Sequence, residues 1–521
     1  MRLKVENPMS ESRVHKSLLN AKVNLVFYFL SLFFSFYSRK IFLECLGDNF
    51  IGLTGTLGNI LGYLNLVELG IGSCISFFLY KPLQCGDRGK IEEILSVFGY
   101  LYRKIGLFIL FAGCVVSLCF PWIFNEAGLG MGIVYFSFFS FLGSSLIGYF
   151  INYRQILLQA DQKNYLVAIY FQSAGLVKTA LQIFLAYTYR NLYVWVAIDF
   201  LFGILGCIIL NWKINKEYPW LHPNIRKGKE FLKQYPQIVI KTKQVFLHKI
   251  KDFILRQSDE IFVYSFVSLK MVVFYGNYTM LINKFTLLLN MALDGVTSGV
   301  GNLVAEGNKR NTMKVFWELM SIRYIAAGIM FFGFFFMVEP FISLWLGNGY
   351  VLNKSVLILL LLYSYLLLTN GVVYMYLHAH GLYGDVWAMW TEMSINILLI
   401  FIAGSYIGIV GILIAKITST TLILVLWKPY YLFKEGLKES LKLYWIGVLR
   451  YLLIFVISFF IGYLISVLLP INPLNGWMDF ILYGIILISI YIVCNIPLMY
   501  YWGPGVKDLV NRVVPKIRNL F

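Results

Sequence analysis

Ten ionisable side chains lie inside apolar stretches long enough to cross a membrane, and they are the residues best placed to do chemistry. On insertion scales an ionised group at mid-bilayer costs about 3 kcal/mol, so it usually faces a partner or a watery cavity. The set contains Glu68, Lys178, Asp199, Arg256, Asp259, Glu260, Lys284, Asp294, Glu392 and Lys416. Such groups can hold an anion, a coupling cation or one another.

The densest group is Arg256, Asp259 and Glu260, whose i, i+3 and i+4 spacing places them on one helix face. One interpretation is a local ion pair that lets a polar helix insert. The other is a cavity-lining cluster in which Arg256 contacts an anionic group of a substrate and a carboxylate binds a coupling cation. Lys284 has apolar neighbours on both sides and poor routes to either interface, so we expect it to face a cavity or pair with an acid.

The other charges give weaker signals. Arg39 and Lys40 follow the first apolar stretch, where they either anchor it at the interface or form a basic rim that attracts phosphate. The sequence does not separate coupling acids from simple counter-ions. The expected substrate-binding residues are Arg256, Lys284, Lys178, Lys416 and Arg39. The expected ion-coupling residues are Asp259, Glu260, Asp294, Glu392 and Glu68.

Signals for enzymatic chemistry are missing from the sequence. His378 and His380 are spaced i, i+2 and do not share a helix face, so we expect no metal site. The seven cysteines contain no CxxC pair. There is no Walker loop, nucleophile elbow or zinc-protease motif. We therefore expect no catalytic residues and no cofactor, apart from a coupling sodium ion or proton.

The composition of the chain is that of a membrane protein, so the charges described above lie in a mostly apolar sequence. Of 521 residues, 59% are hydrophobic and 13% are charged, whereas soluble proteins average about 45–50% and about 25%. The mean hydropathy is +0.73. The net charge of +18 fits the excess of Lys and Arg in cytoplasmic loops of membrane proteins, so we expect no nucleic-acid partner.

Apolar runs of roughly 20 residues predict an all-α polytopic membrane protein with about fourteen transmembrane helices. The expected spans are residues 23–37, 50–80, 105–124, 130–150, 165–187, 193–211, 245–267, 271–304, 324–346, 355–377, 386–407, 410–427, 445–469 and 477–501. Spans 50–80 and 271–304 exceed the bilayer thickness and must tilt, bend or protrude. Span 245–267 is the most polar, and it is retained because its removal breaks the charge pattern.

The distribution of Lys and Arg gives an orientation. With fourteen spans and the N-terminus inside, 34 of the 44 Lys and Arg residues fall in cytoplasmic segments. Five lie on the opposite side: Arg39, Lys40, Arg190, Lys270 and Lys354. This asymmetry predicts that both termini are cytoplasmic.

The longest polar stretch divides the spans into six and eight. An even first half implies parallel repeats, and a weak one is visible: GDRGK at 86–90 and GNKRN at 307–311 each separate a long apolar span from the next. The expected domains are residues 1–211 (first lobe), 212–243 (cytoplasmic connection), 244–431 (second lobe) and 432–521 (two further spans and tail). The lobes would be two pseudo-symmetric six-helix bundles.

Local motifs then resemble a known family. The first set is SRKIFL at 38–43, LGDNFIGL at 46–53, LVELGIG at 66–72 and LYKP at 79–82. The second set is SDEIFV at 258–263, YGNY at 275–278 and GNLVAE at 301–306. With the span pattern, the chain resembles Wzx-type polysaccharide (O-antigen) flippases of the multidrug/oligosaccharidyl-lipid/polysaccharide (MOP) exporter superfamily.

The resemblance implies a transporter that moves an undecaprenyl-diphosphate-linked oligosaccharide to the outer leaflet of the cell inner membrane, for surface polysaccharide or lipopolysaccharide synthesis. Its partners would be that substrate and membrane lipid, together with a polysaccharide polymerase and glycosyltransferases if it works in a complex. The alternatives are a cation-coupled multidrug exporter, a lipid II flippase, or a membrane polymerase or ligase. The last is disfavoured because the expected external connections are short.

Overall fold

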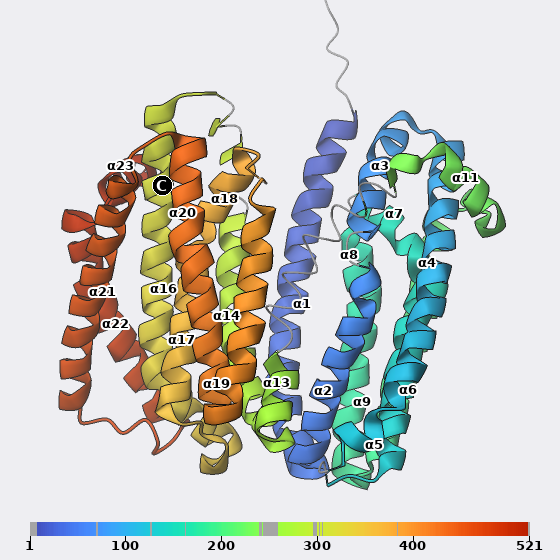
Figure 1. Ribbon diagram of the computed structural model, residues 1–521, viewed down its shortest axis with the longest axis horizontal. Helices are drawn as coiled ribbons and strands as arrows, with labels where there is room; N and C mark the ends of the chain where they lie inside the picture. The colour runs from blue at the N-terminus through green and yellow to red at the C-terminus, as the bar shows by residue number, and fades with distance from the viewer. Residues whose placement is uncertain are drawn as a thin grey trace, which may run out of the picture. The chain divides into compact units, whose positions relative to one another are not determined.

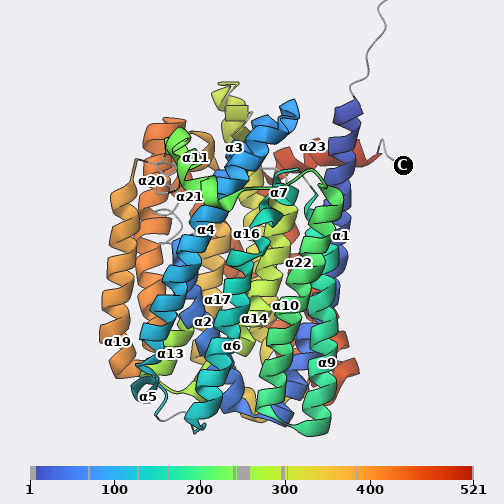
Figure 2. The same ribbon diagram turned by 90° about the vertical axis from the view of Figure 1, so that its right-hand side faces the viewer.

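The computed structural model describes residues 8–68, 71–125, 128–161, 163–238, 242, 259–294, 300, 301, 303, 304, 306–382 and 384–518. Within these ranges the chain forms helices and no strands (Figures 1 and 2), which confirms the predicted all-α class. It divides into two compact units, Met1–Tyr264 with Leu269–Val273, and Ser265–Ser268 with Phe274–Phe521. The predicted domain limits at residues 211, 243 and 431 stay predictions.

In the described part of the chain, ten helical segments are long and apolar enough to cross a membrane. They are Lys22–Leu46, Arg88–Ser117, Met131–Phe150, Tyr165–Tyr189, Leu192–Glu217, Lys309–Leu346, Lys354–Ala379, Val386–Leu437, Leu441–Leu468 and Trp477–Trp502. The chain is therefore a multi-pass membrane protein. The count of fourteen stays a prediction, because most of expected span 245–267 lies outside the described residues.

The first unit is a helical bundle joined by short turns. Its elements are α1 (Pro8–Leu46), α2 (Asp48–Leu64), η1 (Asn65–Glu68), α3 (Ile71–Cys85), α4 (Arg88–Ser117), α5 (Phe120–Ile123), α6 (Met131–Phe150), η2 (Asn152–Arg154), α7 (Gln155–Ala160), α8 (Asn164–Val167), η3 (Ala168–Gln172), α9 (Ser173–Tyr189), α10 (Leu192–Glu217), η4 (Ile225–Lys227), α11 (Gly228–Gln234) and the start of α13 (Asp259–Phe266). Helix α1 packs on α9, and α6 packs on both α4 and α10. A Cβ on Gly143 would lie 2.8 Å from the Phe200 ring, so this glycine permits the close α6–α10 approach.

The expected long span at residues 50–80 is divided in the structure. Helix α2 ends at Leu64, the 3-10 turn η1 follows, and α3 begins at Ile71. One straight helix over this span would be about 46 Å long, well beyond the roughly 30 Å hydrocarbon core. The break takes up the excess length and places the polar residues Asn65 and Glu68 in the middle of an apolar stretch.

The second unit contains α14 (Leu269–Asp294) from Phe274 onward, α16 (Lys309–Leu346), η5 (Asn348–Tyr350), α17 (Lys354–Thr369), α18 (Gly371–Ala379), α19 (Val386–Thr420), η6 (Thr421–Trp427), α20 (Lys428–Tyr431), η7 (Leu432–Leu437), α21 (Leu441–Leu468), α22 (Trp477–Trp502) and α23 (Val506–Arg518). Figure 1 shows α21 and α22 beside α16. Glycines allow this packing, because a Cβ on Gly447 would lie 2.3 Å from the Trp317 ring and one on Gly484 would lie 2.4 Å from Met337. The two C-terminal helices are thus part of this unit.

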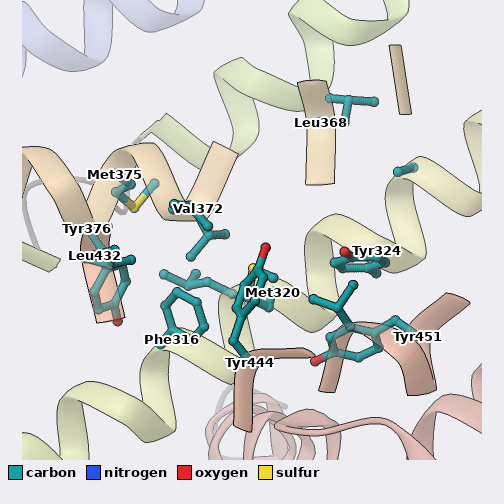
Figure 3. Close-up of a cluster of buried hydrophobic side chains, with 14 of the residues drawn as sticks. Phe316, Met320, Tyr324, Leu368, Val372, Met375, Tyr376, Leu432, Tyr444 and Tyr451 are labelled. Atoms are coloured by element: carbon teal, nitrogen blue, oxygen red, sulfur yellow. The ribbon is translucent and has the colours of Figure 1, made fainter. Parts of the chain in front are cut away.

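The core of the second unit is rich in aromatic side chains. Figure 3 shows Phe316, Tyr324, Tyr376, Tyr444 and Tyr451, which come from α16, α18 and α21. The Tyr324 and Tyr451 rings stack with centroids 4.5 Å apart. The Tyr451 hydroxyl donates to the Pro504 carbonyl at 2.6 Å, which fixes the connection to α23. Buried tyrosines need such partners for their hydroxyl groups.

The segment Val386–Leu437 is two helices, as the sequence predicts. Ile407 and Gly408 leave helical geometry, and Gly408 has φ +55 and ψ −131. Lys428 Nζ lies 2.7 Å from Asp385 Oδ2, so the end of the second helix returns to the start of the first. A Cβ on Gly411 would lie 2.1 Å from the Ala403 carbonyl oxygen, so the tight hairpin requires glycine there. The break confirms the predicted boundary between spans 386–407 and 410–427.

The expected repeat has a local structural counterpart. Gly86 and Gly307 have φ +68 and φ +72, a conformation that favours glycine. The next residues, Asp87 and Asn308, cap α4 and α16 by accepting from the backbone amides of Lys90 and Asn311, both at 3.1 Å. The Lys90 amide and side chain lower the pKa of the Asp87 carboxyl. Identical geometry at matching positions is what an internal repeat predicts.

Candidate functional site

Glu68 is the best-organised intramembrane carboxylate of the first unit. The η1 turn presents it to α4 and α6. Its Oε1 accepts from the Tyr102 hydroxyl at 2.5 Å, and its Oε2 accepts from the Tyr149 hydroxyl at 2.6 Å. The Asn65 Oδ1 accepts from Ser145 at 3.1 Å on the same turn. Hydroxyl donors on both oxygens stabilise a charge that would otherwise be costly in the membrane.

A cavity of about 440 Å³ opens beside this carboxylate. Its wall includes Glu68 and Tyr102 with three amide side chains, Asn152, Gln155 and Gln159. Carboxylate, amide and phenol groups offer both donors and acceptors, and aromatic rings offer flat apolar faces. This lining can bind a neutral polyhydroxylated group or a hydrated cation.

A second acidic cluster in the first unit joins α2 to the start of α13. The Asn59 side chain donates to Glu260 Oε2 at 2.8 Å, and Asp259 is buried beside it. The guanidinium of Arg39 acts electrostatically on Glu260 and donates to the Val273 carbonyl at 3.5 Å. Glu260 therefore lies within electrostatic reach of Arg39, which the sequence places near an outer surface. Arg256, their expected partner, lies outside the described residues.

Lys178 has a specific acidic partner. Its Nζ lies 2.5 Å from Asp199 Oδ1, across the contact between α9 and α10. Both side chains are about three-quarters buried, with exposed fractions of 28% and 21%. The geometry favours the paired alternative over a substrate-facing lysine.

The Lys178–Asp199 pair gives a first test. Lys178→Met should lower the free energy of unfolding of the purified protein by about 1–2 kcal/mol, because it leaves the largely buried Asp199 carboxylate unpaired. The double variant Lys178→Met/Asp199→Leu should recover most of that loss. Melting in detergent measures both. A Lys178→Met protein of normal stability with impaired transport would instead support substrate contact.

The second unit holds further buried charges. Lys416 is buried with its ammonium 4.5 Å from the Tyr363 ring centre, and Glu392 is buried on α19. Lys284 is half-buried on α14, and Asp294 ends that helix with its side chain outside the described residues. The substrate-binding and coupling roles of these residues stay predictions.

One buried cation is missing from the expected set. The sequence assigns Arg323 to a cytoplasmic segment, but it lies well inside α16, 6% exposed. Its Nη1 donates to Asn290 Oδ1 at 2.6 Å. Its guanidinium packs against Gly371, where an added Cβ would lie 3.0 Å from the Arg323 Cζ. Helix α16 starts at Lys309, before the expected span 324–346, so Arg323 is part of the helix.

Three segments predicted to be cytoplasmic gather at one end of the first unit. Glu92 accepts from the His222 amide at 2.7 Å, and Tyr235 donates to Glu93 at 2.8 Å. Lys163 pairs with Glu217 at 2.9 Å. Burial works against the charged ammonium of Lys163, but its hydrogen bonds to carboxylates outweigh this and raise its pKa. This grouping agrees with the predicted orientation, although the side of the membrane stays a prediction.

No family model and no curated protein matches the chain. Solved structures do match it. The lipid II flippase MurJ, in an inward closed conformation, aligns with a TM-score of 0.62 and 15% identity over 90% of this chain and 98% of that chain. An inward-facing multidrug resistance MATE family transporter of the MOP superfamily aligns at 0.58 and 13% identity, over 81% and 99%.

This chain therefore shares the fold of these two structures. By name, one of these structures is a flippase and the other is a transporter. The coverage of 98% of MurJ means that the fold is matched over nearly its whole length. At 15% and 13% identity the similarity is evidence for the fold alone, so the substrate must be inferred from the residues of the site.

The sequence identifies Glu68 as a candidate but misses the residues that organise it. Tyr102, Tyr149 and the amides of Gln155 and Gln159 lie in stretches that read as ordinary apolar helix or loop. A usable signal is the set of uncharged polar residues that follows span 130–150, because polar side chains near a membrane span usually have a partner.

Proposed function

We propose that the chain is a flippase for undecaprenyl-diphosphate-linked oligosaccharides, moving them from the cytoplasmic to the outer leaflet by alternating access. The observation that carries the proposal is the cavity of about 440 Å³ beside Glu68. Its amides and tyrosines match the alternating donors and acceptors of sugar hydroxyls. The apolar faces of Tyr80 and Phe98 in the same wall suit packing against a sugar ring.

The fold supports a lipid-linked cargo. The MurJ neighbour is named as a flippase for lipid II, and the alignment spans 98% of that chain. Such a substrate has a polar head that cannot cross hydrocarbon alone and a polyprenyl tail that can stay in lipid. The motifs at residues 38–82 resemble the Wzx-type family, which carries oligosaccharides for O-antigen and lipopolysaccharide synthesis.

The buried charges receive roles within this proposal. The hydrogen-bond donors to Glu68 and Glu260 are neutral, Tyr102 and Tyr149 for the first and Asn59 for the second, so each carboxylate is a candidate site for a coupling cation. Asp259, Asp294 and Glu392 are further coupling candidates. Arg39, Arg256, Lys284 and Lys416 would attract the diphosphate. Lys178 is assigned to structure because of its pairing with Asp199.

A cation-coupled multidrug exporter is the second candidate, favoured by the MATE neighbour and by the carboxylate in the cavity wall. The two functions differ in the charged residues that they require. A drug exporter needs its acids to hold cationic drugs, whereas a flippase of a diphosphate also needs buried bases.

The test is the leaflet on which lipid-linked oligosaccharide accumulates. Cells lacking this protein should build up the lipid-linked oligosaccharide on the cytoplasmic leaflet and lose surface polysaccharide. Expression of the intact chain should restore both, and sensitivity to cationic drugs should not change. Normal surface polysaccharide in the deletion strain, together with increased drug sensitivity, would favour the exporter instead.

A further inference from the structure

A basic pocket at the end of the first unit is not used by the site described above. It has a volume of about 670 Å³ and is lined by residues of α4, of η2 and of the segment that precedes α11. Arginines come from all three: Arg103, Arg154 and Arg226, with His222 beside them. Figures 1 and 2 both place α11 at the same end of this unit as the start of α4.

The positive charge of the arginines in this pocket is not neutralised by their hydrogen bonds. Arg154 donates from Nη1 to Asn215 Oδ1 at 2.8 Å and from Nη2 to Asn211 Oδ1 at 2.7 Å. Both acceptors are neutral amides, so the guanidinium is oriented but keeps its full charge. In the described part of the chain, Arg103 and Arg226 form no ion pair. Glu92, the acid bonded to this segment, accepts from the His222 backbone and does not line the pocket.

The wall of the pocket is built by specific contacts. Gly228 lies against α4 so closely that a Cβ there would be 2.4 Å from the Ser96 carbonyl oxygen. Asn224 caps η4 by accepting from the Lys227 amide at 3.4 Å, and Leu221 is buried. These contacts fix the segment carrying His222 and Arg226 opposite Arg103 and Arg154. The arginines are thus held around a common space before any ligand arrives.

We propose that this pocket binds the phosphate groups of a membrane lipid at the cytoplasmic surface. Guanidinium groups match phosphate oxygens with paired hydrogen bonds, and several converging arginines suit a phosphate or diphosphate better than a carboxylate. The pocket lies among segments predicted to be cytoplasmic, where membrane surfaces carry anionic headgroups. Tyr153 lines both this pocket and the cavity beside Glu68, so a headgroup bound here adjoins the proposed sugar site. Phosphate binding here does not depend on the proposed transport function.

The test measures lipid binding by the full-length protein in neutral-lipid nanodiscs. One arm uses undecaprenyl diphosphate and the other uses phosphatidylglycerol. Arg103→Gln/Arg226→Gln should weaken binding at least tenfold, because each exposed arginine supplies charge-assisted hydrogen bonds without supporting the fold. The matched control is Lys104→Gln/Lys229→Gln, which removes the same charge from exposed residues outside the pocket lining and should change binding less than twofold.

The arms separate the two phosphate sources. Loss confined to undecaprenyl diphosphate assigns the pocket to the lipid carrier, and equal loss in both arms assigns it to phospholipid headgroups in general. Either result supports a phosphate site. Unchanged binding of both lipids by the arginine variant, or equal weakening by the lysine control, would overturn the proposal. Because the readout is binding, a failed transport assay would leave this result interpretable.

Discussion

Replacing Glu68 by Gln should lower the transport rate at least tenfold while the protein accumulates and folds normally. Gln keeps the shape of the side chain and can still accept a hydrogen bond from one tyrosine. It removes the charge that the hydroxyls of Tyr102 and Tyr149 hold at 2.5 and 2.6 Å. A tenfold loss corresponds to about 1.4 kcal/mol, a modest value for a charged group inside a membrane.

Companion variants separate charge from hydrogen bonding. Tyr102→Phe and Tyr149→Phe each remove one donor and should give smaller losses than Glu68→Gln. The matched control is Glu230→Gln, an exposed acid on α11, which should transport at the normal rate. Initial transport rates in vesicles, normalised to protein amount, give the comparison. Normal transport by Glu68→Gln would reduce the cluster to a structural element of the α2–α4–α6 contact.

Replacing Lys428 by Met should lower the free energy of unfolding more than either of the other lysine replacements, Lys178→Met and Lys434→Met. Lys428 and Asp385 form an ion pair at 2.7 Å, each with a side chain 6% exposed. The Trp427 indole also donates to Asp385 at 3.0 Å. Removing one partner leaves a buried charge unpaired, which costs about 3–5 kcal/mol. The melting temperature in detergent should fall by several degrees. Asp385→Asn should also destabilise the protein, because it leaves the buried Lys428 ammonium without a counter-charge, but by less, because the Asn oxygen can still accept its hydrogen bond.

The pair closes the hairpin of α19, so its loss should also loosen the break at Gly408. The double variant Lys428→Met/Asp385→Leu should recover part of the stability by removing both charges. Lys434→Met, an exposed lysine six residues along the same segment, should change stability by less than about 0.5 kcal/mol. Equal melting temperatures for the Lys428 and Lys434 variants would contradict the assigned role of the buried pair.

The pattern of apolar residues predicted where helices form, but it said less about which helices and side chains contact one another. Long apolar runs predicted the helical class and two spans, 386–407 and 410–427, between which the structure leaves helical geometry at Ile407 and Gly408. The excess length of residues 50–80 predicted a tilt, bend or protrusion, and the structure has a break there at η1, whose position the sequence did not give. The sequence did not identify Arg323 as a buried charge inside α16. Hydropathy measures transfer of a segment to lipid, so a buried charge inside a protein bundle looks like a span end.

The candidate site shows the same division. The cost of intramembrane charge identified Glu68, Lys178 and Glu260 as residues that need an explanation. Whether each finds a tyrosine, an aspartate or an amide depends on packing between helices far apart in sequence, and single-chain spacing carries no such information. Tyr102 lies 34 residues from Glu68 and Tyr149 lies 81 residues from it.

The most direct test of the central claim is flipping by the purified protein in proteoliposomes. The substrate is a fluorescent undecaprenyl-diphosphate oligosaccharide, and a membrane-impermeant quencher reports the outward-facing fraction over time. Proteoliposomes containing the chain should lose nearly all fluorescence, whereas protein-free vesicles should stop near half. Glu68→Gln proteoliposomes should pass from the protein-free level to the wild-type level at least ten times more slowly. Fluorescence that stays at the protein-free level with the wild-type chain, under every ion gradient and alongside uptake of a cationic dye, would contradict a lipid-linked oligosaccharide flippase.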